Sequence, residues 1–246
     1  MSRADVTEPT TEPTTEPTTG LLWTIVVPLK RSSDAKTRLA PWLGPRAREE
    51  LMRAMVGDAL AAAAAATRVG RVVVVTGDPA MAGVAREVLG QAPGVVLDVV
   101  EEPDPSGLNP AVRAGIDAAR RVSGSNGVGV LLGDLPALRP AELDEALGAA
   151  ERLPRGVVAD AAGTGTTLLT ALPGVTLDPA FGPGSASLHR ARGHASIPTT
   201  PGSGLSHDVD VPSDLASALA IGVGPRTHEA VRAAGRGSPQ PGPVTV

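Results

Sequence analysis

The sequence predicts a single α/β domain, Rossmann-like in architecture, in which helices cover both faces of a mostly parallel β-sheet. Two observations support this fold class. Apolar β-branched segments alternate with segments of helical periodicity along the chain, which is the order typical of βαβ units. The run RVVVVT at residues 71–76 has four consecutive valines instead of alternating polar and apolar residues, which indicates a strand buried on both faces.

The expected strands and helices follow one another without an interdomain linker. Strands are expected at residues 22–27, 71–76, 95–100, 128–132, 157–160 and 166–172. Helices are expected at residues 46–67, 79–89, 109–122, 140–153, 185–192 and 212–220. The first helix has apolar residues at helical spacing and is rich in alanine. The third should begin at Asn109, whose side chain can cap the helix with Pro110 at the first helical position.

Both ends of the chain are expected to be disordered. Residues 1–19 contain three TEPT units, and residues 235–246 are rich in glycine and proline. Segments of this composition cannot bury enough apolar surface to offset the entropy of ordering them. The folded domain should therefore be residues 20–234, an ordinary size for one α/β domain.

The composition excludes several classes of protein. The 246 residues include no cysteine, which rules out disulfides and thiolate metal sites, and the net charge is −4. Trp23, Trp42 and Phe181 are the only aromatic residues, and the basic residues are scattered, so neither nucleic acid nor an anionic membrane is an expected partner. No apolar run is long enough to cross a bilayer and no secretory signal is evident, so we expect a cytoplasmic protein.

A cationic segment follows the first strand, where open α/β sheets bind their ligands. It contains Lys30, Lys36 and Arg38 and matches neither a Walker loop nor a dinucleotide-binding loop. These side chains could neutralise the charge of a nucleotide triphosphate. A solvated basic turn would contain the same residues.

Carboxylates occur where two other segments should reach the same edge of the sheet. Asp134 follows the strand at residues 128–132, and a carboxylate there suits Mg²⁺, although it could instead cap the next turn. Asp208 and Asp210 could supply a second metal ligand. We expect only one of this pair to reach the ligand, with the other turned outward or capping the last helix.

Two segments rich in glycine and hydroxyl groups could bind an anion. The first, GTGTT at residues 163–167, could form a nest of amides and hydroxyls, or simply a tight hairpin. The second, FGPGS at residues 181–185, offers Ser185 as the cap of a helix whose start attracts anions. His189 could contact the ligand from this helix, and His194, His207 and His228 are expected at the surface.

Six segments together resemble one enzyme family. They are VVPLKRSSDAKTRLAP, the Leu108–Asn109 pair before a helix, LLGDLPAL, DAAGTGTTLL, FGPGSASLHR and DVDVPSDL. The chain resembles the 2-phospho-L-lactate or phosphoenolpyruvate guanylyltransferases of deazaflavin coenzyme F-420 biosynthesis, over essentially its whole folded part. The resemblance implies a nucleotidyltransferase fold similar to that of molybdenum-cofactor guanylyltransferases. It also implies transfer of GMP from GTP to phosphoenolpyruvate or 2-phospho-L-lactate, with release of pyrophosphate.

The resemblance also implies roles for residues that match the family's motifs by position. The residues of the nucleotide-phosphate loop would be Lys30, Lys36 and Arg38. Asp134 would bind Mg²⁺ together with Asp208 or Asp210. The residues that hold the small phosphorylated acid would be Thr167 (or, less directly, Thr166), Gly182 and Ser185. The chain departs from the family at Ser32 and Ser33, where an apolar residue is common.

Two alternatives remain open from the sequence. One is a related nucleotidyltransferase that uses a molybdopterin or sugar-phosphate acceptor, against which the GTGTT and FGPGSA segments argue. The other is an inactive nucleotide-binding module, which retention of the acids and cations disfavours. A homo-oligomer and a hand-off of product to a downstream transferase are both compatible with the sequence, and which phospho-acid is accepted stays open.

Overall fold

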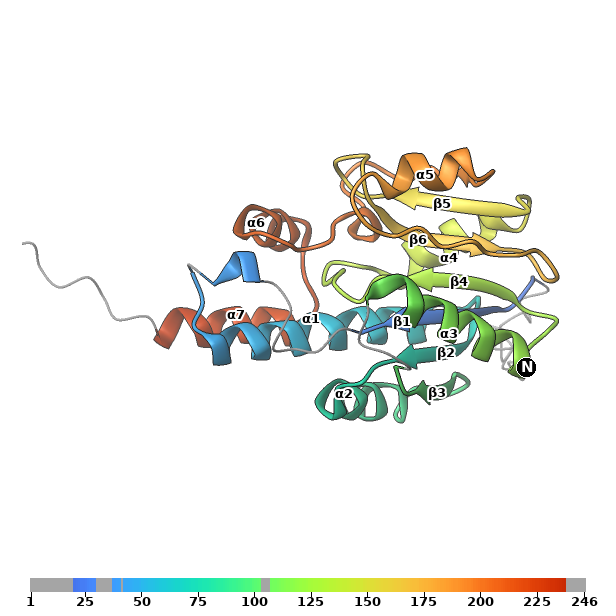
Figure 1. The fold of residues 1–246 in the computed structure, drawn as a ribbon. Coiled ribbons are helices and arrows are strands. Elements are labelled where there is room, and N and C mark those ends of the chain that lie inside the picture. The colour runs from blue at the N-terminus through green and yellow to red at the C-terminus, as the bar shows by residue number, and fades with distance from the viewer. Residues whose placement is uncertain (1–19, 30–36, 41, 103–106, 238–246) are drawn as a thin grey trace, which may run out of the picture.

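The computed structural model describes residues 20–29, 37–40, 42–102 and 107–237 of the chain (Figure 1). Three sequence predictions therefore lie outside the described residues. They concern the disordered arm at residues 1–19, the two lysines of the cationic segment, and the tail beyond Gly237. Within the described ranges, no helix is both long and apolar enough to cross a membrane.

A seven-stranded sheet forms the centre of the domain, with strand order β3-β2-β1-β4-β6-β5-β7. All neighbouring strands are parallel except β6, which runs antiparallel to both β4 and β5. The strands are β1 (Trp23–Pro28), β2 (Val69–Val75), β3 (Val96–Val100), β4 (Gly127–Leu131), β5 (Arg155–Ala159), β6 (Thr166–Ala171) and β7 (Ala195–Ser196). The predicted mostly parallel sheet is thus confirmed.

Helices cover both faces of this sheet, as predicted (Figure 1). The α-helices are α1 (Pro45–Ala65), α2 (Pro79–Leu89), α3 (Leu108–Val122), α4 (Pro140–Ala150), α5 (Ser185–Ala191), α6 (Pro212–Ile221) and α7 (Pro225–Gly237). There are also two short 3-10 helices in the described residues. η1 (Thr37–Leu39) precedes α1, and η2 (Gly204–Ser206) precedes α6.

Two apolar clusters fill the space between sheet and helices. Consecutive residues of β1 point to opposite faces, so Ile25 packs in the cluster with α1, α2 and α4, whereas Val26 packs in the cluster with α3. Both side chains are fully buried. This two-sided burial explains why the central strands are continuously apolar in sequence.

One helix was absent from the sequence prediction. α7 follows α6 and lies along α1, and it extends three residues into the tail expected to start at residue 235 (Figure 1). Its first turn is held by Asp58 of α1, which accepts hydrogen bonds from the backbone N–H groups of Arg226 (3.2 Å) and Thr227 (2.7 Å). Since this cap comes from a residue distant in sequence, the local sequence does not predict where α7 begins.

Candidate active site

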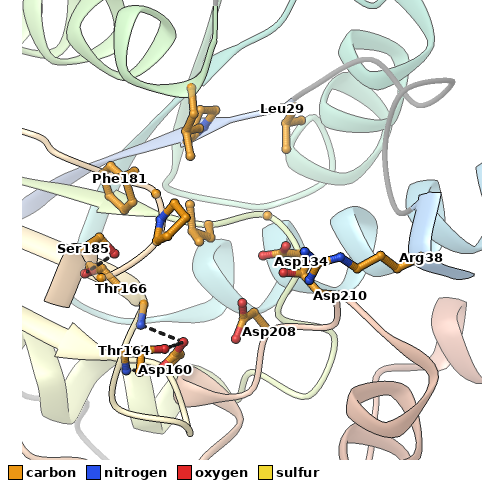
Figure 2. A pocket seen from close by; sticks show the side chains of 18 of the residues that line it. Leu29, Arg38, Asp134, Asp160, Thr164, Thr166, Phe181, Ser185, Asp208 and Asp210 are labelled. Atoms are coloured by element: carbon orange, nitrogen blue, oxygen red, sulfur yellow. Dashed lines mark hydrogen bonds between the residues drawn. The ribbon is translucent and has the colours of Figure 1, made fainter.

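A cleft of about 660 Å³ opens at the carboxyl ends of β1 and β4 (Figure 2). Its volume lies in the range of pockets that bind small molecules and cofactors. The residues that line it come from eight separate segments of the chain. Those with polar side chains are Arg38, Asp134, Asp160, Thr164, Thr166, Ser185, Asp208 and Asp210.

Three carboxylates, Asp134, Asp208 and Asp210, form the acidic side of the cleft. Asp134 follows β4, and its backbone oxygen accepts a hydrogen bond from the N–H of Val209 at 3.1 Å, which ties the two acidic segments together. Val209 is fully buried, while Asp208 and Asp210 on either side of it both line the cleft. The expectation that only one of the pair reaches the cleft is wrong, because alternate residues of an extended segment share one side.

The residue that caps α6 is Asp214, and not Asp208 or Asp210 as the sequence suggested. Asp214, inside the helix, accepts hydrogen bonds from the N–H groups of Asp210 and Val211, both at 2.9 Å. Asp214 therefore caps α6 in place of Asp208 or Asp210, and both of these residues line the cleft.

Burial and the neighbouring acids raise the pKa of Asp208 to about 7. Burial contributes most to this shift, followed by the negative charges of Asp134, Asp210 and Asp160. Crowded carboxylates of this kind fit a divalent cation, which would offset their repulsion. Within the described parts of the chain, however, no three acidic or histidine side chains are arranged to hold a metal ion by themselves. A Mg²⁺ ion here would therefore need phosphate oxygens of a bound nucleotide to complete its shell, as is usual for this ion.

Of the three cationic side chains predicted for the nucleotide-phosphate loop, Arg38 lies within the described residues. Arg38 extends from η1 into the cleft, where its guanidinium points toward Asp134 and Asp210 (Figure 2). Lys30 and Lys36 lie outside the described residues, as does the Ser32–Ser33 departure, so their roles stay predictions.

The other side of the cleft contains hydroxyl groups. Thr166 at the start of β6 and Ser185 at the start of α5 both line it, and Ser185 Oγ donates a hydrogen bond to Thr166 Oγ1 at 3.2 Å. Gly182 lines the same side with φ 137°, a conformation that favours glycine. The side chain of Thr167 is fully buried and does not line the cleft, so its role as an acceptor ligand stays a prediction, and Thr166 is the threonine that the geometry offers.

Two backbone amides at the start of α5 are bonded within the chain. Gly184, not Ser185, precedes α5, and the N–H groups of Ser185 and Ala186 donate to the carbonyls of Gly182 and Thr164, both at 3.1 Å. The expectation that Ser185 caps this helix is therefore wrong, and binding of an anion at the start of the helix stays a prediction. The hydroxyl groups of Thr166 and Ser185 are side-chain groups that could donate to a ligand on this side of the cleft.

Asp160 shapes the GTGTT turn and was not singled out from the sequence. Its carboxylate accepts hydrogen bonds from the N–H groups of Thr164 and Gly165, both at 2.8 Å. The turn joins β5 to the antiparallel β6, so the tight hairpin considered as an alternative is present, and it also lines the cleft. The signal available in the sequence was the acid placed four residues before Thr164.

Asn109 holds the FGPGS segment and does not cap α3. The helix begins one residue earlier, at Leu108. The Asn109 amide donates to the Phe181 carbonyl at 2.9 Å and accepts from the Phe181 N–H at 2.8 Å. An Asn–Pro pair has the local signature of a cap, but this paired contact with a distant backbone determines where the side chain lies.

Replacing Asn109 with alanine should loosen the FGPGS segment. Two backbone groups of Phe181 would lose their partners, so we expect the free energy of unfolding to fall by about 2 kcal/mol and the acceptor KM to rise. Urea titration and steady-state kinetics would measure these effects. Asn126→Ala is the matched control, since the Asn126 amide donates to Thr24 Oγ1, at 3.3 Å, and neither residue lines the cleft. Equal acceptor KM values for the two variants would contradict this role for Asn109.

Two histidines are buried: His189, which was expected as a possible ligand contact, and His194, which was expected at the surface. His189 is 0% exposed and does not line the cleft, so it makes no direct contact with a ligand there. His194 is 3% exposed, and its ring packs edge to face against that of His189 with centroids 5.5 Å apart. The Phe181 ring also packs edge to face against His189, at 5.2 Å. Burial lowers the pKa of both imidazoles, that of His189 to about 4. His207 is only partly exposed, and His228 is exposed as expected.

Comparisons with known proteins identify the family of the chain. Residues 23–237 match the model of the CofC family, described as "Guanylyl transferase CofC like". A phosphoenolpyruvate guanylyltransferase of Sanguibacter keddieii is 49% identical over 241 residues, covering 84% of this chain and 83% of the relative. One of Streptomyces scabiei is 47% identical over 208 residues, covering 85% and 95%.

Solved structures resemble the fold at low sequence identity. A candidate nucleotide-diphospho-sugar transferase of Desulfovibrio desulfuricans G20 has a TM-score of 0.63 at 18% identity, covering 86% of this chain and 94% of that one. A 4-diphosphocytidyl-2C-methyl-D-erythritol synthase of Anaerococcus prevotii has a TM-score of 0.54 at 9% identity, covering 81% and 95%. The fold is thus that of nucleotidyltransferases, and by its match over residues 23–237 the chain belongs to the CofC-like guanylyl transferase family.

Proposed function

We propose that this protein transfers GMP from GTP to phosphoenolpyruvate and releases pyrophosphate, as a step of coenzyme F-420 biosynthesis. The observation that supports this most strongly is that one cleft joins an acidic side, suited to a metal-bound triphosphate, to a hydroxyl side, suited to a small anion. The names of the relatives that are 49% and 47% identical support phosphoenolpyruvate as the acceptor.

The reaction needs no general base. A phosphate oxygen of the acceptor attacks the α-phosphorus of GTP, a new P–O bond forms, and the bond to the β-phosphate breaks so that pyrophosphate leaves. The attacking phosphate is already anionic at neutral pH. This fits a cleft whose described lining contains no histidine: the buried His189 and His194 are not among its lining residues.

The residues would act by positioning and by neutralising charge. Thr166 and Ser185 would hold an anionic group of the acceptor, with Gly182 allowing close approach of the backbone. Arg38 would contact the triphosphate, together with Lys30 and Lys36. Asp134 with Asp208 or Asp210 would hold Mg²⁺, which supplies charge neutralisation on the phosphate oxygens.

Some parts of the proposal rest on the sequence alone. They are residence in the cytoplasm, any homo-oligomer, and hand-off of the product to a downstream transferase. 2-Phospho-L-lactate and a 3-phosphoglycerate-like acid stay alternative acceptors, because they differ from phosphoenolpyruvate by little more than planarity and a hydroxyl group.

An acceptor panel tests the proposal. The protein would be incubated with GTP, Mg²⁺ and either phosphoenolpyruvate, 2-phospho-L-lactate, 3-phosphoglycerate or a sugar phosphate, with a downstream transferase present to consume an unstable product. We expect mass spectrometry to detect a GMP adduct with phosphoenolpyruvate, and much less adduct when ATP or CTP replaces GTP. A GMP adduct with the sugar phosphate alone would assign another acceptor class. Nucleotide binding without any adduct would indicate an inactive module.

A further inference from the structure

His189 lies directly behind the hydroxyl side of the cleft and bonds to it. Its Nδ1 atom is 2.9 Å from Thr166 Oγ1, and its Nε2 atom accepts a hydrogen bond from the Ala180 N–H at 2.9 Å. Both nitrogens of this buried ring are therefore engaged, one by a backbone group and one by a residue of the cleft.

The Ala180 contact determines the tautomer of the ring. A backbone N–H can only donate, so Nε2 must be the unprotonated nitrogen of a neutral imidazole. The ring proton then lies on Nδ1, and Nδ1–H donates to Thr166 Oγ1. The low pKa of His189, about 4 because of its burial, supports a neutral ring at physiological pH.

This tautomer leaves one hydroxyl proton to spare. Thr166 and Ser185 have two hydroxyl protons between them, and one of these occupies the Ser185–Thr166 hydrogen bond. His189 cannot accept the second, because its Nδ1 is already protonated. Thr166 and Ser185 are only 4% and 1% exposed, and the cleft is the side on which both residues meet an open space (Figure 2).

We propose that His189 is a positioning residue that keeps one hydroxyl proton of the Thr166–Ser185 pair directed into the cleft, as a donor to an anionic group of the acceptor. The inference rests on the proposed function for the identity of that anion. The opposite tautomer would accept the Thr166 proton and leave oxygen lone pairs facing a negative ligand, which would weaken its binding.

The tautomer can be measured without any substrate. Histidine ¹⁵N labelling and NMR of the wild-type protein at pH 7 should give a protonated Nδ1 and an unprotonated Nε2 for His189. Assignment would use His189→Asn, in which that signal disappears. A protonated Nε2 with an unprotonated Nδ1 would overturn the proposal, whatever the protein catalyses.

Two substitutions separate the contacts of the ring in kinetics. In His189→Asn the amide nitrogen can occupy the place of Nδ1 and still donate to Thr166, whereas in His189→Gln the amide reaches only toward Ala180. We expect the acceptor KM to rise about tenfold for the glutamine variant and less than about threefold for the asparagine variant, with the GTP KM within about twofold of wild type for both. His194→Gln, a change of a neighbouring buried imidazole bonded to Gly156, is the matched control and should leave the acceptor KM within about twofold.

A double-mutant comparison tests whether His189 affects the acceptor KM through Thr166. When Thr166→Val is already present, His189→Gln should raise the acceptor KM by less than about twofold more. An increase of the same size as in the wild-type background, or a parallel rise of the GTP and acceptor KM values, would reduce His189 to a packing role and overturn the proposal. A wild-type protein that uses no acceptor would instead contradict the proposed function, and the NMR result would still decide the proton arrangement.

Discussion

Replacing Asp134 with asparagine should lower the rate of pyrophosphate release about 10³-fold or more while the protein stays folded. Asparagine keeps the shape of the side chain but removes the negative charge that faces Arg38 and lies beside Asp208 in the cleft (Figure 2). The fold should survive because Asp134 holds its neighbour through the backbone, whose oxygen accepts the Val209 N–H. A coupled pyrophosphate assay would measure the rate, and circular dichroism would follow thermal unfolding.

Asp144 of α4 provides the matched control for Asp134. Its carboxylate accepts hydrogen bonds from the backbone N–H groups of Thr67 and Arg68, both at 2.9 Å, and does not line the cleft. Asp144→Asn should therefore lower stability and leave turnover near the wild-type value. Full activity of the Asp134→Asn variant would remove Asp134 from the mechanism.

Replacing Asp208 with asparagine should change stability and activity in opposite directions. The pKa of Asp208 is raised from 3.8 to about 7 by burial and by the neighbouring acids, so between these pH values the folded protein binds more protons than the unfolded chain. Stability of the metal-free protein should therefore fall as pH rises from about 4 to 7, and the loss should be complete above pH 7. The full linkage value is about 4 kcal/mol, and we expect about half of it because the carboxyl keeps some contact with solvent.

Urea unfolding at pH 5 and pH 8 without metal would test this pH dependence. The wild type should lose stability over this interval, whereas Asp208→Asn should lose much less and be about 2 kcal/mol more stable than wild type at pH 8. Its turnover should nonetheless fall about 100-fold, since the acidic side has lost a charge. Asp210→Asn removes one of the charges that act on Asp208, but from an exposed side chain, so it should raise stability at pH 8 by less than Asp208→Asn does. A metal-free Asp208→Asn protein less stable than wild type at pH 8 would contradict the crowding of charges described for the cleft.

The parts of the fold that the sequence predicts are those set by local pattern. Continuous β-branched runs identified the central strands, and α2 was expected at the residues where it is found. Asp134 could be placed at the cleft because it directly follows a strand, and parallel strands bring their carboxyl ends to one edge of the sheet. Local residue types and a general rule of topology were sufficient for these predictions.

The parts that the sequence does not predict depend on contacts between distant segments. α7 is capped by Asp58 from another helix, and Asn109 bonds to the backbone of Phe181 and not to its own helix. The burial of His189 follows from the way α5 packs against the segment around Phe181. None of these contacts produces a recognisable residue spacing in the sequence, because each joins residues that only the tertiary fold brings together.

Isotope tracing tests the central claim most directly, namely that an acceptor phosphate held on the hydroxyl side attacks the α-phosphorus of GTP held on the acidic side. The protein would be incubated with unlabelled GTP, Mg²⁺ and phosphoenolpyruvate labelled with ¹⁸O on the non-bridging oxygens of its phosphate. The products would be separated, and mass spectrometry would measure the ¹⁸O content of each. We predict that all the label stays in the GMP-containing product and that the pyrophosphate carries none. Labelled pyrophosphate, or pyrophosphate formed without a labelled GMP-containing product, would contradict it.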